Sequence, residues 1–321
     1  MTRFKANLLS FATGIRHGVA LPEGGTASVL AQDARDITVL SDAGVVTAGS
    51  IAFAPTPDVS GCPAHVVPVS GSVSQCGAEL QAGDDFYLQV QGYAMAGFLT
   101  LVGPTLVRVQ DEDDTQAFLA DADAALAAGR FPPMLTYPLL HLADPGALGL
   151  PTPFDGPGLR LYVDADHVAH IGPNGPAIGT VDELDPEAWR GPAPPQPPPD
   201  GAAAALAARP WLARYLVVVQ AMQSFVARGL PDVQVSGFGG RLLHPGAPSG
   251  TDVADVHAPV LARSGNTYLV YVPDSGRTFR ATPDTAAVVE QLVIAPDAAD
   301  IRQLHPSLLS LLCPAPVAAG A

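Results

Sequence analysis

The segment from Asn266 to Leu292 constrains the fold of this chain more than any other. Two short β-prone runs, Thr267–Val272 and Arg277–Ala281, flank the tetrapeptide Pro-Asp-Ser-Gly. Proline sets the φ angle of a turn, aspartate and serine bond to the nearby backbone, and glycine accepts a positive φ. The segment therefore predicts a β-hairpin from its turn chemistry as well as from its composition.

A helix is expected directly after the hairpin. Thr282 offers a hydroxyl that can cap the helix, Pro283 suits the first helical position, and Asp284 places an acid in the first turn. Apolar residues follow at helical spacing, namely Ala286, Ala287, Val289, Leu292 and Val293. Two strands and a helix are thus predicted in immediate succession.

The charge balance of the 321-residue chain limits its partners. The chain has 16 Lys plus Arg against 31 Asp plus Glu, a formal net charge of −15. A field of this sign repels nucleic acid and anionic lipid, so we expect neither nucleic acid nor a membrane as a partner. The apolar run after Phe4 is broken by Gly14 and Arg16, which does not match a secretory signal. A cytoplasmic protein is expected.

Residues 1–190 are expected to form a mixed α/β domain, whose role the sequence does not indicate. Short β-prone runs predict strands at Ile37–Leu40, Ser50–Ala54, His65–Val69, Phe86–Val90 and Leu106–Gln110. A helix is predicted over Asp111–Gly129, because acids crowd its start and a glycine follows its end. Arg160–Val163 and His167–Ile171 are predicted to form another hairpin.

A proline-rich run is expected to divide the chain. Residues 191–201 include Pro-Ala-Pro-Pro-Gln-Pro-Pro-Pro, which favours an extended polyproline II linker. Residues 202–257 are expected to be helical and loop-rich, with Pro210 separating two helices. The second helix carries an apolar stripe made of Trp211, Tyr215, Val218, Met222 and Phe225. Such a stripe usually belongs to a core, and a ligand pocket is the alternative.

Two histidines form the pattern closest to a metal site. His167 and His170 lie near Asp164 and Asp166, and carboxylate and imidazole ligands suit several divalent ions. Three residues apart on a strand, however, the two histidines would face opposite sides. We therefore expect no metal site here.

Other patterns that could indicate a cofactor or a nucleophile are incomplete. Gly237, Gly239 and Gly240 follow a strand, but Pro245 stops the helix that would hold a dinucleotide phosphate. Cys76 has no basic neighbour in the sequence that would activate its thiol. The cysteines at positions 62, 76 and 313 form no metal-type pair. We expect no cofactor and no catalytic residues.

The remaining chemistry lies in the C-terminal hairpin. An edge strand offers unpaired backbone groups to which a peptide can add as a further strand. Arg277, Phe279 and Ala281 are expected on one face of the strand, and Thr278 and Arg280 on the other. The two arginines could pair with acidic residues of a peptide, or they could only protect the edge from aggregation.

This strand–turn–strand–helix pattern resembles the core of the RiPP recognition elements, small winged-helix domains of the PqqD-like fold that bind peptides. The matching residues are Leu269-Val270-Tyr271, Gly276-Arg277-Thr278-Phe279-Arg280, Thr285-Ala286-Ala287-Val288-Val289 and Leu292. The similarity covers Ala258 to about Leu312, within an expected domain of residues 258–321. It implies a second helix over Ala298–Leu304 and a third over Pro306–Cys313.

The resemblance also implies a site. In this family a leader peptide docks as an added strand between the third strand and the third helix, which here are Arg277–Ala281 and Ser307–Leu312. The implied peptide-binding residues are Arg277, Thr278, Phe279, Arg280, Ala281, Leu308, Leu311 and Leu312. The implied role is recognition without catalysis or a cofactor.

The whole chain, with its alanine-rich and actinobacterial-like composition, is similar to the recognition proteins of daptide biosynthesis. The expected fold class is α+β or mixed α/β. The similarity implies a non-catalytic protein that captures the leader of a ribosomal precursor peptide and presents its core to partner tailoring enzymes. Two alternatives remain. One is a hydrolase or metal-dependent enzyme that uses His167 and His170 or Cys76, and the other is a structural or assembly subunit without a peptide ligand.

Overall fold

The computed structural model describes residues 2–100, 102–152, 155–183, 194–247, 254–295, 300 and 303–312. The chain forms two compact units, one made of Met1–Thr115 and Leu139–Ala203, the other of Gln116–Pro138 and Ala204–Ala321. The first unit extends through the proline-rich run. The second unit includes residues 116–138, which we expected from the sequence to belong to the N-terminal domain. The protein is of the mixed α/β class, with helices and sheets in both units.

The first unit contains a ten-stranded mixed sheet in the order β10-β9-β8-β1-β2-β3-β4-β5-β6-β7. The strands are β1 (Ser28–Ala31), β2 (Ile51–Ala54), β3 (His65–Gly71), β4 (Glu79–Ala82), β5 (Phe86–Gly92), β6 (Thr105–Arg108), β7 (Leu140–Leu142), β8 (Arg160–Val163), β9 (Val168–His170) and β10 (Ala177–Thr180). Strands β8, β1, β2 and β3 are mutually parallel, and so are β5, β6 and β7. Antiparallel β4 joins these two groups.

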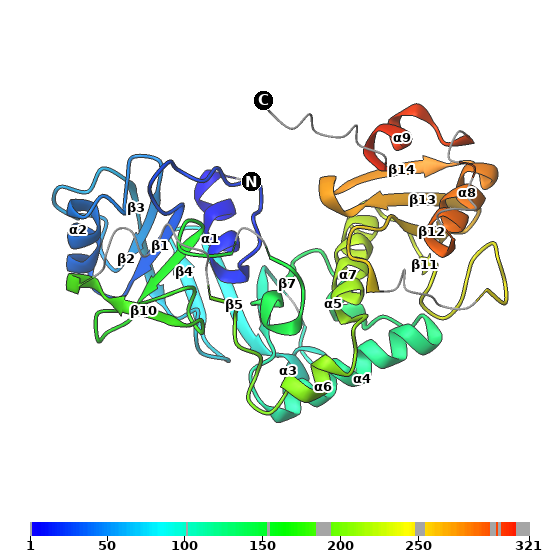
Figure 1. Cartoon of the computed structure of the whole chain (residues 1–321). Helices are drawn as coiled ribbons and strands as arrows, with labels where there is room; N and C mark the ends of the chain where they lie inside the picture. The colour runs from blue at the N-terminus through cyan, green and yellow to red at the C-terminus, as the bar shows by residue number, and fades with distance from the viewer. Residues whose placement is uncertain are drawn as a thin grey trace. The chain divides into compact units, whose positions relative to one another are not determined.

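The helices of the first unit cover both faces of this sheet. They are α1 (Arg3–Thr13), α2 (Ala34–Asp42), α3 (Tyr93–Ala96) and the start of α4 (Glu112–Ala128), with short 3-10 turns η1 (Pro145–Leu148) and η2 (Val181–Glu183). Leu8 and Phe11 of α1 lie in a buried cluster with residues from β1 to β6 and β8, so the strands wrap around this helix (Figure 1). Ile37 and Leu40 of α2 pack on the opposite face.

Most elements expected in the first unit are confirmed. Strands β2, β3, β5 and β6, the β8–β9 hairpin and α4 lie within two residues of their predicted positions. The predicted strand Ile37–Leu40 is wrong, because these residues belong to α2. The carboxylate of Asp33 accepts a hydrogen bond from the Arg35 amide and caps that helix. This capping outweighs the β preference of the Ile-Thr-Val run.

The second unit places a four-stranded antiparallel sheet between helices. The sheet order is β11 (Gln234–Val235), β12 (Val260–Ser264), β13 (Thr267–Val272) and β14 (Arg277–Ala281). The helices are the rest of α4, α5 (Pro133–Thr136), α7 (Leu212–Val226), α8 (Pro283–Ile294) and α9 (Pro306–Leu312), with α6 (Ala203–Ala207) at the junction of the two units.

Each face of the four-stranded sheet is buried. On one face, the ring of Phe225 from α7 meets Tyr271 edge-on, with 6.5 Å between the ring centroids. On the other face, Val270 clusters with Val289 of α8 and Leu308 of α9. The predicted apolar stripe of α7 is confirmed as core from Tyr215 to Phe225. Only the outer edges of the sheet are left unpaired among the described residues.

The predicted C-terminal hairpin and helix are confirmed. Val272 pairs with Arg277 across a turn that ends at Gly276 with a φ of 63°. The Thr282 hydroxyl accepts a hydrogen bond of 3.2 Å from the Thr285 amide at the start of α8. The helix expected over Ala298–Leu304 falls mostly outside the described residues. No helix within the described part is both long and apolar enough to cross a membrane.

The buried carboxylate of Glu290 fixes the loop between β11 and β12 to α8. It accepts hydrogen bonds from the Ser236 hydroxyl, from the backbone amides of Leu242, Leu243 and His244, and from the His244 ring. Burial alone would raise the pKa of Glu290, but the hydrogen bonds from this loop hold it below its ordinary value. The position of this loop against α8 therefore depends on one ionised side chain, that of Glu290.

Replacing Glu290 with glutamine is expected to destabilise the second unit by about 2–4 kcal/mol, because an amide nitrogen would face backbone donors. Asp284→Asn is the matched control, since Asp284 is an exposed carboxylate in the first turn of the same helix. It should cost less than about 1 kcal/mol. Urea denaturation followed by circular dichroism measures the free energy of unfolding of both variants. Equal losses of stability would contradict the proposed role of Glu290 in fixing the loop.

Candidate functional site

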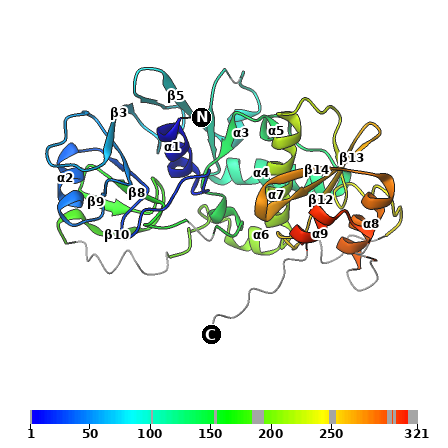
Figure 2. The ribbon, with the colours of Figure 1, turned by 90° about the horizontal axis from the view of Figure 1, so that it is seen from above.

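The free edge of β14 is the first candidate site. β14 is the last strand of its sheet, and α9 is drawn next to it in Figure 1, while Figure 2 shows the same sheet from above. Phe279 of β14 and Leu308 of α9 belong to the same apolar cluster. The strand and the helix are thus held together, and the outward-facing backbone groups of β14 have no neighbouring strand among the described residues.

The side chains of β14 alternate as expected. Arg277, Phe279 and Ala281 oppose Val272, Val270 and Tyr268 and therefore lie on the face that carries α8 and α9. This set forms the "β14 face" below. The Arg277 guanidinium carbon lies 5.0 Å from the centroid of the Phe279 ring. A cation over an aromatic face is attracted to it, so Arg277 covers a half-buried ring while remaining exposed itself.

Thr278 and Arg280 lie on the other face of β14. They oppose Tyr271 and Leu269, whose side chains point toward α7. Arg280 is exposed. The Thr278 hydroxyl is buried and has no hydrogen-bond partner in the described part of the chain. The two arginines of β14 thus project from opposite faces of the same edge.

The α9 side of the implied groove is described only in part. Leu308 is 2% exposed and packs inside the core cluster, so its role is to hold α9 in place. The side chains of Leu311 and Leu312 lie outside the described residues. Among the implied binding residues whose side chains are described, Arg277 and Arg280 of β14 are exposed and Leu308 is not.

The two histidines of the suspected metal site are held by different carboxylates. His167 Nδ1 lies 2.9 Å from Asp36 of α2, and His170 Nε2 lies 3.0 Å from Asp164. No group of three or more metal-ligating side chains is found among the described residues. His167 links the β8–β9 hairpin to α2, His170 bonds to the turn of its own hairpin, and the two rings do not converge on one point.

The cysteine and glycine patterns also have structural roles. The thiol of Cys76 donates to Gln110 at 3.1 Å, and burial raises its pKa, which disfavours the nucleophilic thiolate. Gly239 adopts a φ of 74° and packs against the end of α4, where a Cβ atom would lie 2.5 Å from the backbone nitrogen of Gly129. Glycine is required there for close packing.

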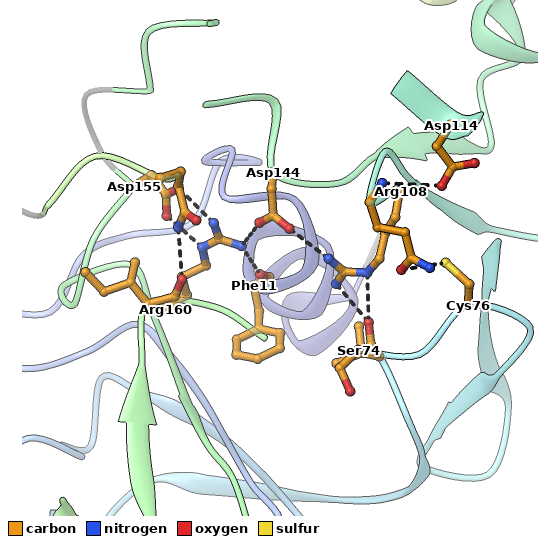
Figure 3. Close-up of polar contacts among 12 residues, drawn as sticks. Phe11, Ser74, Cys76, Arg108, Asp114, Asp144, Asp155 and Arg160 are labelled. Carbon is orange, nitrogen blue, oxygen red and sulfur yellow. Dashed lines mark hydrogen bonds and ion pairs between the residues drawn. The ribbon is translucent and has the colours of Figure 1, made fainter. Parts of the chain in front are cut away.

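A network of buried charges is the second candidate site, in the first unit (Figure 3). Asp144 lies between two guanidinium groups, 2.8 Å from Arg108 and 2.8 Å from Arg160. Arg160 is fully buried and also binds Asp155 through two hydrogen bonds of 2.6 and 2.8 Å. Arg108 donates in addition to the carbonyl of Val73, at 2.8 and 3.2 Å.

The network contains two guanidinium groups and two carboxylates, so its formal charges cancel. Burial opposes ionisation of Asp144, but Arg160 and Arg108 hold its pKa below the ordinary value. Gly14 and Gly172 approach the Arg160 guanidinium so closely that a Cβ atom on either would lie 2.6 Å from a guanidinium nitrogen. A cavity of about 300 Å³ opens beside Arg108 and Asp144. Because the ionised groups already pair with one another, this arrangement is suited to holding strands together.

A pair of histidines lies near α1 in the same unit. The ring of His17 meets that of His141 edge-on, with 6.0 Å between centroids. His17 Nε2 lies 3.1 Å from the hydroxyl of Thr13. Burial lowers the pKa of both histidines, and the proximity of His17 contributes to lowering that of His141 to about 4. Both rings are therefore neutral at pH 7.

Several charged residues with central positions were not expected from the sequence, namely Arg108, Asp144, Arg160 and Glu290. For two of these residues, the sequence pattern itself indicates a charge at a buried position. Glu290 follows Ala286 by one helical turn and so falls on the apolar face of its helix. Arg160 begins a strand whose other residues are apolar. Charged residues at core positions predict buried ion pairs, although their partners cannot be identified from one sequence.

Comparison of this chain with protein-family models, with curated proteins and with solved structures found no match. The resemblance described above therefore remains a prediction that rests on local sequence and geometry.

Replacing Arg160 with methionine is expected to destabilise the first unit by about 3–5 kcal/mol, because Asp155 would lose its cation in a buried setting. Arg35→Met is the matched control, since Arg35 pairs with Asp182 at 3.7 Å on the surface. It should cost no more than about 1 kcal/mol. Chemical denaturation compares the two, and a small loss for Arg160→Met would show that the network contributes little.

The lowered pKa values of the half-buried His17 and His141 predict a loss of stability on acidification. The folded pKa of His141 is about 4, below the ordinary histidine pKa of about 6.5. The unfolded chain therefore binds more protons as the pH falls from 6.5 to 4, and stability drops in that window. Between pH 7.5 and pH 5 the loss due to His141 should be about 2 kcal/mol.

Denaturation at both pH values, with His141→Gln as the variant, tests this expectation. Between pH 7.5 and pH 5, His141→Gln should lose less stability than the unmodified protein loses. The control His65→Gln, at an exposed position of β3, should lose as much stability as the unmodified protein. An unchanged pH dependence in His141→Gln would refute the assignment.

Proposed function

We propose that this protein recognises an extended peptide, which adds as a fifth strand to the free edge of β14. One observation carries the proposal, namely that β14 ends its sheet with α9 beside it and has no neighbouring strand in the described residues. Backbone N–H and C=O groups at such an edge bind an extended chain through main-chain hydrogen bonds. The succession of a hairpin, α8 and α9 along the chain also supports the proposal.

The side chains of β14 favour a particular peptide chemistry. The Phe279 ring and Ala281 offer apolar surface to alternate residues of an added strand. The exposed guanidinium groups of Arg277 and Arg280 attract acidic residues in a protein whose net charge is −15. Such pairs give orientation and a faster association more than affinity. The preferred ligand is thus an extended segment with alternating apolar residues and nearby acids.

The biological ligand that fits the resemblance is the leader of a ribosomal precursor peptide. Binding the leader would bring the rest of the precursor close to a tailoring enzyme and raise its effective concentration there, without chemistry by this chain. The tailoring enzymes of the same pathway are then the protein partners. An assembly subunit without a peptide ligand is the alternative that the following experiment separates.

Fluorescently labelled peptides from short reading frames beside the gene should bind the full-length protein saturably, as followed by anisotropy. The double variant Arg277→Glu/Arg280→Glu is expected to weaken binding at least tenfold, because it reverses both charges at the edge. Phe279→Ala should also weaken binding, since it removes the ring that an added strand would contact.

The matched control is Arg228→Glu/Arg263→Glu, which makes the same change in net charge elsewhere in the second unit. Arg228 is exposed after α7, and Arg263 lies on β12, where it binds Gln234. Circular dichroism verifies that each variant is folded. If both double variants bind equally well, β14 is not the site, and if no peptide binds the unmodified protein, the assembly alternative is favoured.

A further inference from the structure

The first unit contains a second cavity, of about 460 Å³, at the carboxyl ends of its parallel strands. It is named the β1–β3 cavity here. Ala31 ends β1, Pro55 follows β2, and Gly71 ends β3, while Tyr162 of β8 completes the wall. The volume falls within the range of about 300–1,000 Å³ that is usual for small-molecule sites.

The cavity lies where the strand order of the sheet reverses. From β1 the chain passes through α2 to β2 and then to β3 on one side. It later returns to the other side of β1 as β8, which is parallel to it. In open α/β sheets, ligands bind outside the carboxyl ends of the strands at such a switch point. The topology therefore favours a binding site at this place.

The wall of the cavity is polar but uncharged. Its polar side chains are Gln32, Ser70, Ser72, Ser74, Gln75 and Tyr162. None of the described residues that line it carries a charge, although the protein has a net charge of −15. The rest of the wall is glycine and apolar side chains such as Leu30 and Leu80. A ligand with hydroxyl or amide groups on one side and an apolar surface on the other would match it.

Part of this wall keeps hydrogen-bonding capacity for a ligand. The side chains of Ser70 and Gln75 make no hydrogen bond with the described residues, and Gln32 uses only its amide nitrogen, which donates to the Tyr162 hydroxyl. In the cavity beside Arg108, by contrast, Asp144 is paired, Gln110 accepts from Cys76, and Gln196 donates to a backbone carbonyl. The β1–β3 cavity is the better candidate for binding.

The buried charge network holds this wall in place. Val73 lies in the serine-rich loop (residues 72–75) between β3 and β4, and it is 2% exposed. Its carbonyl accepts two hydrogen bonds from Arg108. Arg108 is in turn fixed by Asp144. The loop is thus anchored at its centre, with Ser72 and Ser74 on either side bonded to each other at 3.0 Å. A rigid wall of this kind is already organised for a ligand.

We propose that the β1–β3 cavity binds an uncharged small molecule of the nucleoside type, with hydroxyl and amide groups at one edge and an apolar ring face. The site is separate from the β14 edge and does not depend on peptide binding. It gives the first unit a ligand of its own.

Saturation-transfer NMR with the full-length protein and adenosine, guanosine, cytidine and uridine tests the proposal. At least one nucleoside should bind saturably, and its 5′-monophosphate should bind about tenfold more weakly, because no cation lines the cavity to compensate the phosphate. Ser70→Val and Gln32→Leu, both at exposed positions, should each weaken nucleoside binding about tenfold. Ser60→Val, at an exposed position outside the cavity, is the control and should leave it unchanged.

Three results would overturn the proposal. Failure of all four nucleosides to bind would remove the ligand class, and equal or tighter binding of the monophosphates would contradict the uncharged character of the site. Binding that survives both Ser70→Val and Gln32→Leu would place the ligand elsewhere.

Discussion

The first unit depends on one carboxylate, that of Asp144, placed between two buried guanidinium groups. Arg108 ends β6, Asp144 follows β7, and Arg160 begins β8, so this single side chain ties three strands around α1. Burying any one of these ions alone would cost several kcal/mol. Each ion must therefore keep its partners, and this requirement fixes the path of the chain from β6 to β8. Because Arg108 also donates to the Val73 carbonyl, the network fixes the serine-rich loop after β3 as well.

Among the described residues, the sheet of the second unit is left unpaired only at its two outer edges, on β11 and β14. Phe225 and Tyr271 cover one face, and Val289 with Leu308 covers the other. β14, with five residues against two in β11, offers the longer row of unpaired main-chain groups, and exposed arginines lie on both of its faces. Charges at an edge also discourage aggregation, so the same residues can both protect the edge and select an acidic peptide.

Local chemistry could be predicted from the sequence, and long-range pairing could not. The turn ending at Gly276 and the cap at Thr282 act within a few residues, so the hairpin and α8 were expected correctly. Ile37–Leu40 was expected as a strand because its β-branched residues favour strands, and the helix cap at Asp33 was not recognised in the sequence. Arg108 and Arg160 meet at Asp144 only after the sheet has wrapped around α1, and no pattern in one sequence encodes that meeting.

Amide hydrogen exchange of β14, with and without a bound peptide, tests strand addition most directly. Alternate residues of an edge strand direct their N–H groups outward, so an added strand should slow exchange at alternate amides between Arg277 and Ala281. The amides that already pair with β13 should change little. Saturated peptide binding with unchanged exchange throughout β14 would contradict the central claim that the peptide adds to this edge.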